Sequence, residues 1–193
     1  MRVIAVDDGY FPVEYKGCRG YTVLLAIRYI VERHSVEGIA YTYILVDGVD
    51  ATEKACRLIE ALSSRDVDTV ILDGVTYAGF NYIDPYTLYK TVGIPVIVFY
   101  RHALDISRIR NALYKNFRDA EKRYSVIEKT LENRCTFATK WGIYSYTPVG
   151  IPVDKARDIL YKTQLYSPEP EPLRIADKLA SLTARKLHCR GRL

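Results

Sequence analysis

The first 46 residues carry three segments rich in apolar, aromatic and β-branched side chains, at residues 2–11, 21–31 and 39–46. This composition is typical of β-strands, and short polar stretches separate the segments. The connections at residues 13–20 and 32–38 are too short for a parallel return, which needs about a dozen residues or more. The pattern therefore predicts an antiparallel meander of three strands.

From residue 51 the apolar positions change to the spacing of a helix. The residues that share one helical face are Ala55, Leu58, Ile59 and Leu62. Asp50 and Thr52 are both candidates for the N-cap, because their side-chain oxygens can accept hydrogen bonds from free backbone N–H groups. We expect an amphipathic helix that packs on the sheet.

Continuous apolar runs at residues 69–72 and 95–100 flank a short helical segment at 86–91. Such runs suit strands that are buried on both faces of a parallel sheet. The later elements expected from the same patterns are a long polar helix at 107–133, a strand at 141–146, and helices at 153–164 and 173–187. The proline-rich stretch 167–172 ends one helix and admits the next, since proline is tolerated in a first helical turn.

The order of these elements predicts the fold class. A three-stranded antiparallel meander, a crossover helix, and then alternating strands and helices form an α/β mixed sheet, with parallel strands after the meander and flanking helices. This is also the order of the ribonuclease H-like superfamily. At 193 residues the chain can bury a full core, so we expect a single domain over residues 1–193.

The composition restricts where the protein works. The sequence contains no apolar run of the roughly 18 to 20 residues that a membrane span requires. Its start, MRVIAVDDGYF, is too acidic, and its apolar part too short, for a secretory signal, so we expect a cytoplasmic protein. The four cysteines lie far apart, which predicts reduced thiols and not a zinc or redox motif.

Charge and tyrosine content bear on possible partners. The net charge of +5 favours polyanions, because basic side chains release counterions from phosphates on binding. The 17 tyrosines can stack on bases, although packing within strands is their commoner role. The composition is compatible with DNA or RNA as a partner but does not establish one.

Three apolar strands end in a carboxylate next to a glycine, in VDDG at residues 6–9, VDGVD at 46–50 and LDG at 72–74. One Asp-Gly pair is commonly a turn, but three at strand ends favour a functional cluster. Grouped carboxylates repel one another unless a cation neutralises them. Oxygen ligands suit Mg²⁺ or Mn²⁺, and the three histidines lack the spacing of a metal site. The chemistry predicts a site at which divalent ions activate water for phosphodiester hydrolysis.

Residues 68–101, DTVILDGVTYAGFNYIDPYTLYKTVGIPVIVFYR, resemble endonuclease V, in which an apolar strand ending in Asp-Gly precedes a glycine-containing loop, a short helix and a proline-led strand. The motif AVDDGYF is similar to the family's first catalytic aspartate. The later WGIY and PEPEPLRIADKLA are similar to its late strand and its last helix start. DGVT, GFN and Asp84 are most similar to a largely archaeal branch of these homologues. The resemblance covers nearly the whole chain and implies a ribonuclease H-like fold.

The resemblance also implies a set of site residues. Endonuclease V cuts nucleic acid near deaminated bases such as inosine, using an Asp, Glu, Asp set with a divalent metal. Asp7 and Asp73 match the first and last of these acids. The middle acid is Asp50 or Glu53, and Asp50 is preferred because it follows the strand end directly. We therefore expect Asp7, Asp50 and Asp73 to hold Mg²⁺ or Mn²⁺, with Asp84 or Glu53 assisting a water.

Three further residues are expected to contact the substrate. Arg101 falls where the family has a lysine at a strand end, which implies phosphate binding, and a solvated strand end is the alternative. Phe80 and Asn81 lie in the glycine-containing loop and are expected to form a pocket wall. A packed turn is the alternative for this loop, given the turn habit of asparagine.

Two departures from the family weigh against inosine specificity. Val149-Gly150-Ile151 replaces the Gly-His that follows the late strand, and YILVDGVDATEK lacks the aromatic-proline wedge before the first helix. The sequence supports three hypotheses. The first is a metal-dependent endonuclease, with DNA repair as its setting. The others are a nucleic-acid-binding or regulatory protein that does not cleave, and a hydrolase or binder of a small phosphorylated metabolite.

Overall fold

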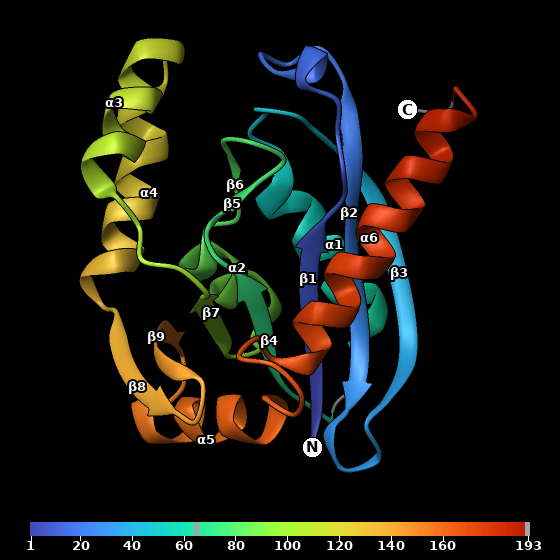
Figure 1. Ribbon diagram of the computed structural model, residues 1–193, viewed down its shortest axis with the longest axis vertical. Coiled ribbons are helices and arrows are strands. Elements are labelled where there is room, and N and C mark those ends of the chain that lie inside the picture. The colour runs from blue at the N-terminus through green and yellow to red at the C-terminus, as the bar shows by residue number, and fades with distance from the viewer. Residues whose placement is uncertain (64–65, 192–193) are drawn as a thin grey trace.

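The computed structural model describes residues 1–63 and 66–191 (Figure 1). Within these residues a seven-stranded sheet has the order β3-β2-β1-β4-β7-β9-β8. Its strands are β1 (Arg2–Asp8), β2 (Tyr21–Ile30), β3 (Ser35–Leu45), β4 (Val67–Asp73), β7 (Val96–Tyr100), β8 (Cys135–Thr139) and β9 (Gly142–Val149). A separate hairpin pairs β5 (Thr76–Tyr77) with β6 (Asn81–Tyr82).

The strand directions confirm the expected mixed sheet. β1, β2 and β3 form the antiparallel meander, and β4 and β7 extend the sheet in parallel from β1. β9 and β8 then add an antiparallel edge. The parallel strands are the buried, continuous apolar runs, as their sequence pattern predicts.

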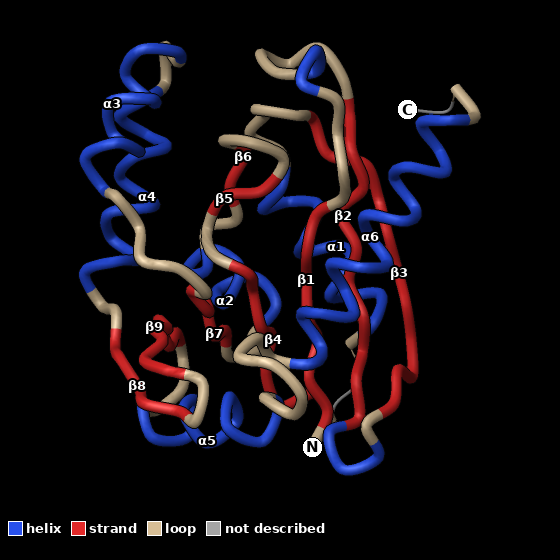
Figure 2. Tube along the Cα trace, in the orientation of Figure 1, coloured by secondary structure: helices blue, strands red, loops and turns tan. Residues whose placement is uncertain are grey.

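Helices cover both faces of the sheet (Figure 2). They are α1 (Ala51–Leu62), α2 (Pro85–Val92), α3 (Ile106–Asn116), α4 (Ala120–Glu132), α5 (Val153–Thr163) and α6 (Glu171–Cys189), with 3-10 turns η1 (Val13–Tyr15) and η2 (Val31–Arg33). α6 packs across β1 and β2, and α1 packs on β2 and β3 from the other side. Two apolar clusters therefore lie on the two faces of one sheet.

β1 illustrates how one strand serves both clusters. Ile4 and Val6 point into the cluster beneath α1, whereas Val3 and Ala5 point into the cluster beneath α6. All four are fully buried. The alternation follows from the two-residue period of a strand. It determines on which side of the sheet each side chain at the strand end lies.

The prediction of one long helix at residues 107–133 is wrong, because the chain forms two helices there, α3 and α4, with a break between them. Phe117 takes an extended conformation at the break and lies under the guanidinium of Arg123, 4.4 Å from ring centroid to Cζ. Arg123 also donates to the carbonyls of Gly48 and Phe80. These tertiary contacts outweigh the local helical pattern at the break.

Several strand boundaries also differ from the expectation. β1 ends at Asp8 and not at residue 11, and β3 begins at Ser35 instead of residue 39. The connection before β3 is a tight turn with His34 in the left-handed region at φ 49°, which frees more residues for pairing. The patterns missed β8, β5 and β6, which are short strands without a long apolar run.

All four cysteines are free thiols. Among the described residues, the apolar stretches of the helices are all too short or too polar to cross a bilayer.

Candidate metal site at the ends of the parallel strands

Asp7 and Asp73 lie side by side at the ends of two neighbouring parallel strands. β1 and β4 pair in a register that puts Val6 beside Leu72, so the next residue on each strand is one of the two aspartates. Val6 and Leu72 both point into the cluster beneath α1, so the aspartates face the opposite side, toward α6. Since neighbouring strands are about 4.8 Å apart, both carboxylates belong to one site.

Burial and mutual repulsion dominate the electrostatics of this site. Burial raises the pKa of Asp7 well above its ordinary value, and the charges of Asp8 and Asp73 raise it further. Burial raises the pKa of Asp8 to about 7, although its carboxylate accepts a hydrogen bond from Ala78 N at 3.0 Å. The pKa of Asp73 rises to about 6 for the same reason, opposed by the positive charge of Arg101. In the free protein the surroundings therefore favour the neutral, protonated forms of these acids.

α6 contributes a fourth carboxylate, Asp177. Its negative charge raises the pKa of Asp7, Asp8 and Asp73, so it faces the same site. The sequence patterns did not single out Asp177 as a site residue, because it lies in an ordinary amphipathic helix far from the other acids along the chain. The signal was present in the PEPEPLRIADKLA motif, which contains it.

Gly9 allows α6 to come this close. A Cβ atom at Gly9 would lie 2.6 Å from both the carbonyl oxygen of Ala180 and the Cβ of Ala184. Asp177 is about one helical turn before Ala180, so this close contact sets its position over the ends of β1 and β4. The Asp-Asp-Gly sequence therefore supplies both the acids and the space for the helix.

Arg101 lies at the rim of the site. Its Nη1 is 3.5 Å from the carboxylate of Glu169, which is 6% exposed, whereas the Arg101 side chain is 51% exposed. Burial raises the pKa of Glu169, and the charge of Asp73 raises it further. A cleft of about 280 Å³ opens beside these groups and is lined by Asp73, Arg101 and His102, among others. The site is therefore accessible from solvent on the Arg101 side.

Asp47, from the second acidic strand end, has a different role. Its carboxylate accepts hydrogen bonds from Gly17 N at 2.8 Å and from Phe80 N at 2.9 Å, and it is 5% exposed. It thereby ties the loop after β1 to the loop between β5 and β6. A Cβ at Gly79, where φ is +85°, would lie 2.3 Å from this carboxylate, so the loop needs glycine there.

Phe80 lines a cavity of about 570 Å³ beside these two loops. Its ring meets the ring of Phe117 edge to face, with 5.5 Å between centroids. Lys16 and Arg19 line the opposite wall from the loop after β1. Phe80 therefore lines a cavity with these residues, and its contact with a substrate stays a prediction.

The structure does not bring Asp50 to the acidic site. Its carboxylate accepts hydrogen bonds from Leu45 N at 3.2 Å and Asn81 Nδ2 at 2.7 Å. In the sheet register Asp7 pairs with Leu25, whereas Leu45 pairs with Tyr21 one strand further out. Asp50 thus lies two strands across, roughly 10 Å, and four residues along, roughly 13 Å, from Asp7.

Asn81 completes the network around Asp50. It is fully buried, and its amide oxygen accepts from Ala51 N at 3.1 Å while its Nδ2 donates to Leu45 O at 2.9 Å. The side chain therefore holds the start of α1 against the end of β3. Its surroundings are those of a structural residue in the interior, which is the packed-turn alternative for this loop.

Glu53 and Asp84 also lie outside the cluster. Glu53 is 63% exposed and pairs with Arg57 one turn later on α1. Asp84 caps α2, accepting from Tyr86 N at 3.0 Å and Thr87 N at 3.3 Å. Neither carboxylate is among the charges that raise the pKa of Asp7 or Asp73.

The segment that replaces the family's Gly-His lies at the opposite end of the strands from the acidic site. Val149 pairs with Val96 at the start of β7, whereas Asp73 pairs with Phe99 near its end. Residues 149–151 also line cavities beside Pro95 and Tyr89. A histidine here would stand far from the acids, so its replacement leaves the acidic site itself intact.

The donor chemistry of the cluster fits a hard divalent cation. The available ligands are carboxylate oxygens, which suit Mg²⁺ or Mn²⁺, and their mutual repulsion would be relieved by positive charge. The Tyr77 side chain is buried, and the charges of Asp7, Asp73 and Asp8 raise the pKa of its hydroxyl after burial itself. Among the described residues, no group of three or more His, Cys, Asp or Glu side chains is arranged so that it could hold a metal ion.

Solved structures of endonuclease V share this fold. Endonuclease V of Ciona intestinalis, in complex with a DNA containing inosine, matches with a TM-score of 0.62 and 12% identity, over 98% of this chain and 86% of that chain. A protein of unknown function from Archaeoglobus fulgidus matches with a TM-score of 0.78 and 24% identity, over 94% and 97%. The fold is thus the ribonuclease H-like fold of endonuclease V-like proteins.

Sequence relatives assign the family. A UPF0215 protein of Thermococcus sibiricus is 36% identical over 181 residues, covering 94% of this chain and 91% of the relative. A UPF0215 protein of Methanosarcina barkeri is 40% identical over 147 residues, covering 76% and 75%. The family described as Endonuclease dU matches residues 1–184. The chain belongs to this endonuclease V-like family, as the motifs predict.

Proposed function

We propose that this protein is an endonuclease that uses Mg²⁺ or Mn²⁺ to hydrolyse phosphodiester bonds of nucleic acid. The observation that carries the proposal is the pair Asp7 and Asp73 on adjacent parallel strands, where Asp7 is buried, Asp73 is partly buried, and the charge of Asp73 raises the pKa of Asp7. Clustering such charges without a cation costs stability, so an arrangement of this kind is typical of a cation site.

Asp7 and Asp73 would hold the cation, with Asp177 approaching from α6. Asp8 would add negative charge while it anchors the β5–β6 loop through Ala78 N. The bound ion would activate water and stabilise the leaving oxygen. The buried position of Asp7 would keep bulk water from competing with the substrate phosphate.

Arg101 would orient the substrate. Its guanidinium is half exposed at the mouth of the cleft that contains Asp73, and it faces the carboxylate of Glu169. A guanidinium binds phosphate with two parallel hydrogen bonds, which lysine cannot do. Arg101 would thus hold a phosphate next to the acids, with Glu169 fixing its position.

The α3–α4 hairpin would bind the nucleic-acid backbone. Residues 101–134 contain nine Lys or Arg against five Asp or Glu, which accounts for +4 of the net charge of +5. α3 has no acidic residue, and its cations Arg108, Arg110 and Lys115 are exposed. In Figure 1 this hairpin stands at the side of the sheet beyond β7, directly after Arg101.

The family's description suggests deoxyuridine as the feature to test first in a DNA substrate. The cavity between Phe80, Phe117, Lys16 and Arg19 has aromatic and cationic walls that suit an unpaired base. Because the wedge of endonuclease V is absent from YILVDGVDATEK, we do not expect inosine to be preferred.

The proposal is tested with end-labelled DNA and RNA that contain one deoxyuridine, one inosine or neither, incubated with Mg²⁺, Mn²⁺ or a chelator. We expect metal-dependent cleavage, reduced at least about 100-fold in Asp73→Asn and about 10- to 100-fold in Asp177→Asn. Asp158→Asn, an exposed acid on α5, is the matched control and should cleave like wild type.

The alternatives give different results in the same assay. Salt-dependent binding of DNA without any cleavage would assign the protein to non-cleaving nucleic-acid binders. Equal cleavage by wild type and Asp73→Asn would contradict the proposed site. Protection by a small phosphorylated metabolite in a thermal-shift screen, with no affinity for nucleic acid at low salt, would favour the metabolite hypothesis.

A further inference from the structure

β3 forms one edge of the sheet, and this edge is long and bare. It is the outermost strand in the sheet order and extends over 11 residues (Figure 1). Its residues 38–45, GIAYTYIL, include no charged residue and no proline. Proteins commonly place such residues on an exposed edge, because its free N–H and C=O groups pair readily with another strand. The β3 edge therefore lacks the usual protection against pairing.

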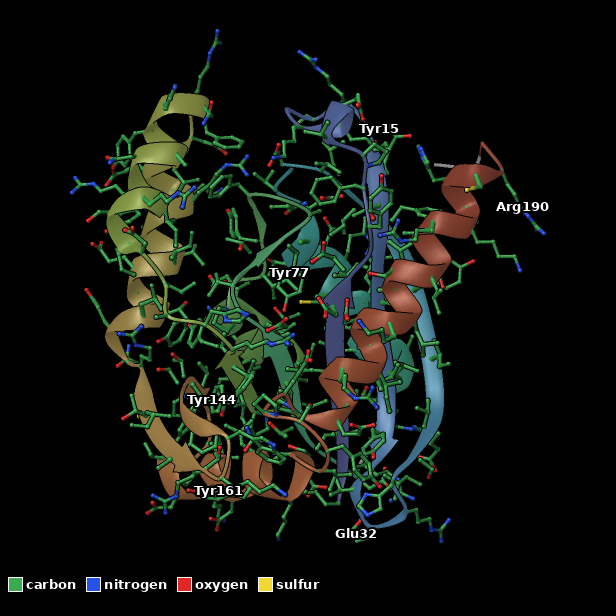
Figure 3. The ribbon with its side chains drawn as sticks, in the orientation of Figure 1. Tyr15, Glu32, Tyr77, Tyr144, Tyr161 and Arg190 are labelled. Carbon is green, nitrogen blue, oxygen red and sulfur yellow. The ribbon has the colours of Figure 1, made fainter. Side chains whose placement is uncertain are left out.

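The opposite edge of the same sheet, β8, carries that protection. It is five residues long and lies between Arg134 and Lys140. Tyr161 of α5, which Figure 3 labels at the lower end of the molecule, donates its hydroxyl to the Ala138 carbonyl at 2.9 Å. β8 is thus short, flanked by cations and capped, whereas β3 has none of these features between residues 38 and 44.

The hydrogen-bond pattern identifies which backbone groups of β3 face outward. In an antiparallel pair, alternate residues bond to the partner strand, and the residues between them direct their N–H and C=O groups to the other side. Val46 N donates to Gly20 O at 2.9 Å, so the even-numbered residues of this stretch bond toward β2. Leu45 accordingly directs its N–H and C=O outward, to the side chains of Asp50 and Asn81.

Ile39, Tyr41 and Tyr43 follow the same alternation, so their N–H and C=O groups also face outward. β3 has no strand on its outer side within residues 1–63 and 66–191. The side chains of the three residues are 53%, 51% and 38% exposed. They lie on the α6 side of the sheet, because Tyr41 pairs with Leu25, which belongs to the cluster beneath α6. The strand therefore presents both free backbone groups and exposed apolar side chains.

These three residues are complementary to a second copy of the same strand. In an antiparallel pairing centred on Tyr41, this residue lies opposite Tyr41 of the second copy, and Ile39 lies opposite Tyr43. Each of these pairs can exchange two backbone hydrogen bonds, since every member presents both groups outward. Aromatic and β-branched side chains then face each other across the strands, which stabilises a sheet. A shift of the centre toward Leu45 would oppose backbone groups that are already bonded.

We propose that β3 is a dimerisation edge: two copies of this chain pair through residues 38–44, antiparallel and related by a two-fold axis at Tyr41, to form one continuous sheet. The inference goes beyond the proposed function and does not depend on it, because it uses no residue of the cation site. The segment is uncharged, so it does not repel a second copy. Nucleic acid would require cations at this edge.

The available area sets the expected strength of the dimer. The half-exposed side chains of Ile39, Tyr41 and Tyr43 offer roughly 300 Å² per copy, since a fully buried aromatic side chain covers about 150–250 Å². A standard stable complex buries about 800 Å² per partner. We therefore expect a reversible dimer with a dissociation constant in the micromolar range.

The pairing would place both acidic sites on one face of the joined sheet. Asp7 lies level with Leu25, and Leu25 lies level with Tyr41. The Asp7 residues of the two copies would therefore lie on a line through the two-fold axis, roughly 24 Å apart across the intervening strands. Both sites would open on the α6 side.

Disulfide cross-linking tests the pairing and its register. The background protein has serine in place of the cysteines that are not buried, Cys18, Cys135 and Cys189. In this background we expect Tyr41→Cys to form a disulfide-linked dimer under mild oxidation, because paired Cα atoms lie about 5.5 Å apart, within disulfide range. Tyr43→Cys is the matched control. It should stay monomeric, since its counterpart would lie roughly 13 Å along the strand.

Sedimentation velocity over a concentration series tests the dimer without a cross-link. We expect wild type to shift from monomer to dimer as its concentration rises. Tyr41→Lys should raise the dissociation constant at least about 10-fold, because it puts like charges directly opposite each other. Tyr166→Lys, at a side chain that is 76% exposed outside β3, is the control and should dimerise like wild type.

Three results would overturn the inference. One is a wild-type protein that stays monomeric at every concentration, together with a Tyr41→Cys protein that does not cross-link. That result would leave the edge exposed or open to a different chain. Another is cross-linking of Tyr43→Cys as readily as Tyr41→Cys, which contradicts the two-fold register. The third is a Tyr41→Lys protein that dimerises like wild type, which would place the contact elsewhere on the surface.

Discussion

Asp8 and Asp73 link protonation to stability, because burial raises their pKa values to about 7 and about 6 in the folded protein. An unfolded aspartate titrates near 4. Between these values the folded state binds more protons than the unfolded state, so the free energy of unfolding must fall as the pH rises. We predict that the metal-free protein loses stability from about pH 4 to about pH 7.

Urea titrations with a chelator at several pH values measure this dependence. Asp8→Asn should flatten the profile, since the pKa of Asp8 is raised further than that of Asp73. Asp158→Asn, outside the site, should leave it unchanged. Stability that rises between about pH 4 and about pH 7 would mean that the acids are neutralised by some other group.

Single residues also mark the limit of sequence-based reasoning. The positions of Asp7 and Asp73 near the ends of β1 and β4 could be predicted, because an apolar run followed by acidic residues and a glycine indicates a strand end. Asp50 shares that local pattern, yet its carboxylate bonds to Leu45 and Asn81, an interaction between distant segments that no local pattern contains. Asp177 was missed because it lies in an amphipathic helix far from the other acids along the chain.

α6 is positioned by its contact with Gly9, which makes this glycine a test of the element. We predict that Gly9→Ala lowers the free energy of unfolding by about 1–3 kcal/mol, the usual cost of overpacking. It should also weaken Mn²⁺ binding, because the added methyl group would push α6 away from β1 and move Asp177 away from Asp7 and Asp73. Urea titration and calorimetry measure the two effects.

A second substitution controls for this effect. Ala184→Gly removes one of the two atoms that the new methyl group would meet, while the Ala180 carbonyl remains. The double variant should therefore recover part of both the stability and the Mn²⁺ affinity. A Gly9→Ala protein as stable as wild type would show that α6 can move away from β1 without cost.

α3 offers a prediction about the nucleic-acid backbone. Replacing Arg108, Arg110 and Lys115 by Ala should weaken DNA binding and lower the slope of log affinity against log salt by about 0.9 for each phosphate that the variant no longer neutralises. Fluorescence anisotropy over a salt series measures the slope. Replacing Lys155, Arg157 and Lys162 on α5 removes the same charge elsewhere. Equal weakening of DNA binding in both triple variants would contradict a specific role for α3.

Helices and strands could be predicted where one periodic pattern of apolar residues continues over the whole element. α1, β4 and β7 follow directly from their apolar periodicity. The break between α3 and α4 does not, because it depends on Arg123 reaching the carbonyls of Gly48 and Phe80 from another part of the chain. The turn and cap residues Asn116 and Asp119 were the local signal that could have indicated it.

At the scale of the whole molecule, the topology explains why the site lies where it does. β1 and β4 run in parallel and end at the same edge, and α6 crosses that edge from the other end of the chain (Figure 1). The order of elements sufficed to predict the mixed sheet. It could not predict that α6 would close over β1, since that packing depends on Gly9 and the small residues Ala180 and Ala184.

The most direct test of the cation site is a crystal structure of the protein grown with Mn²⁺, with anomalous scattering measured at the manganese edge. We predict an anomalous peak between the carboxylates of Asp7 and Asp73, with Asp177 facing it. An ion bound instead at Asp50, Glu53 or Asp84, or no peak beside Asp7 and Asp73 at saturating Mn²⁺, would contradict the proposed site.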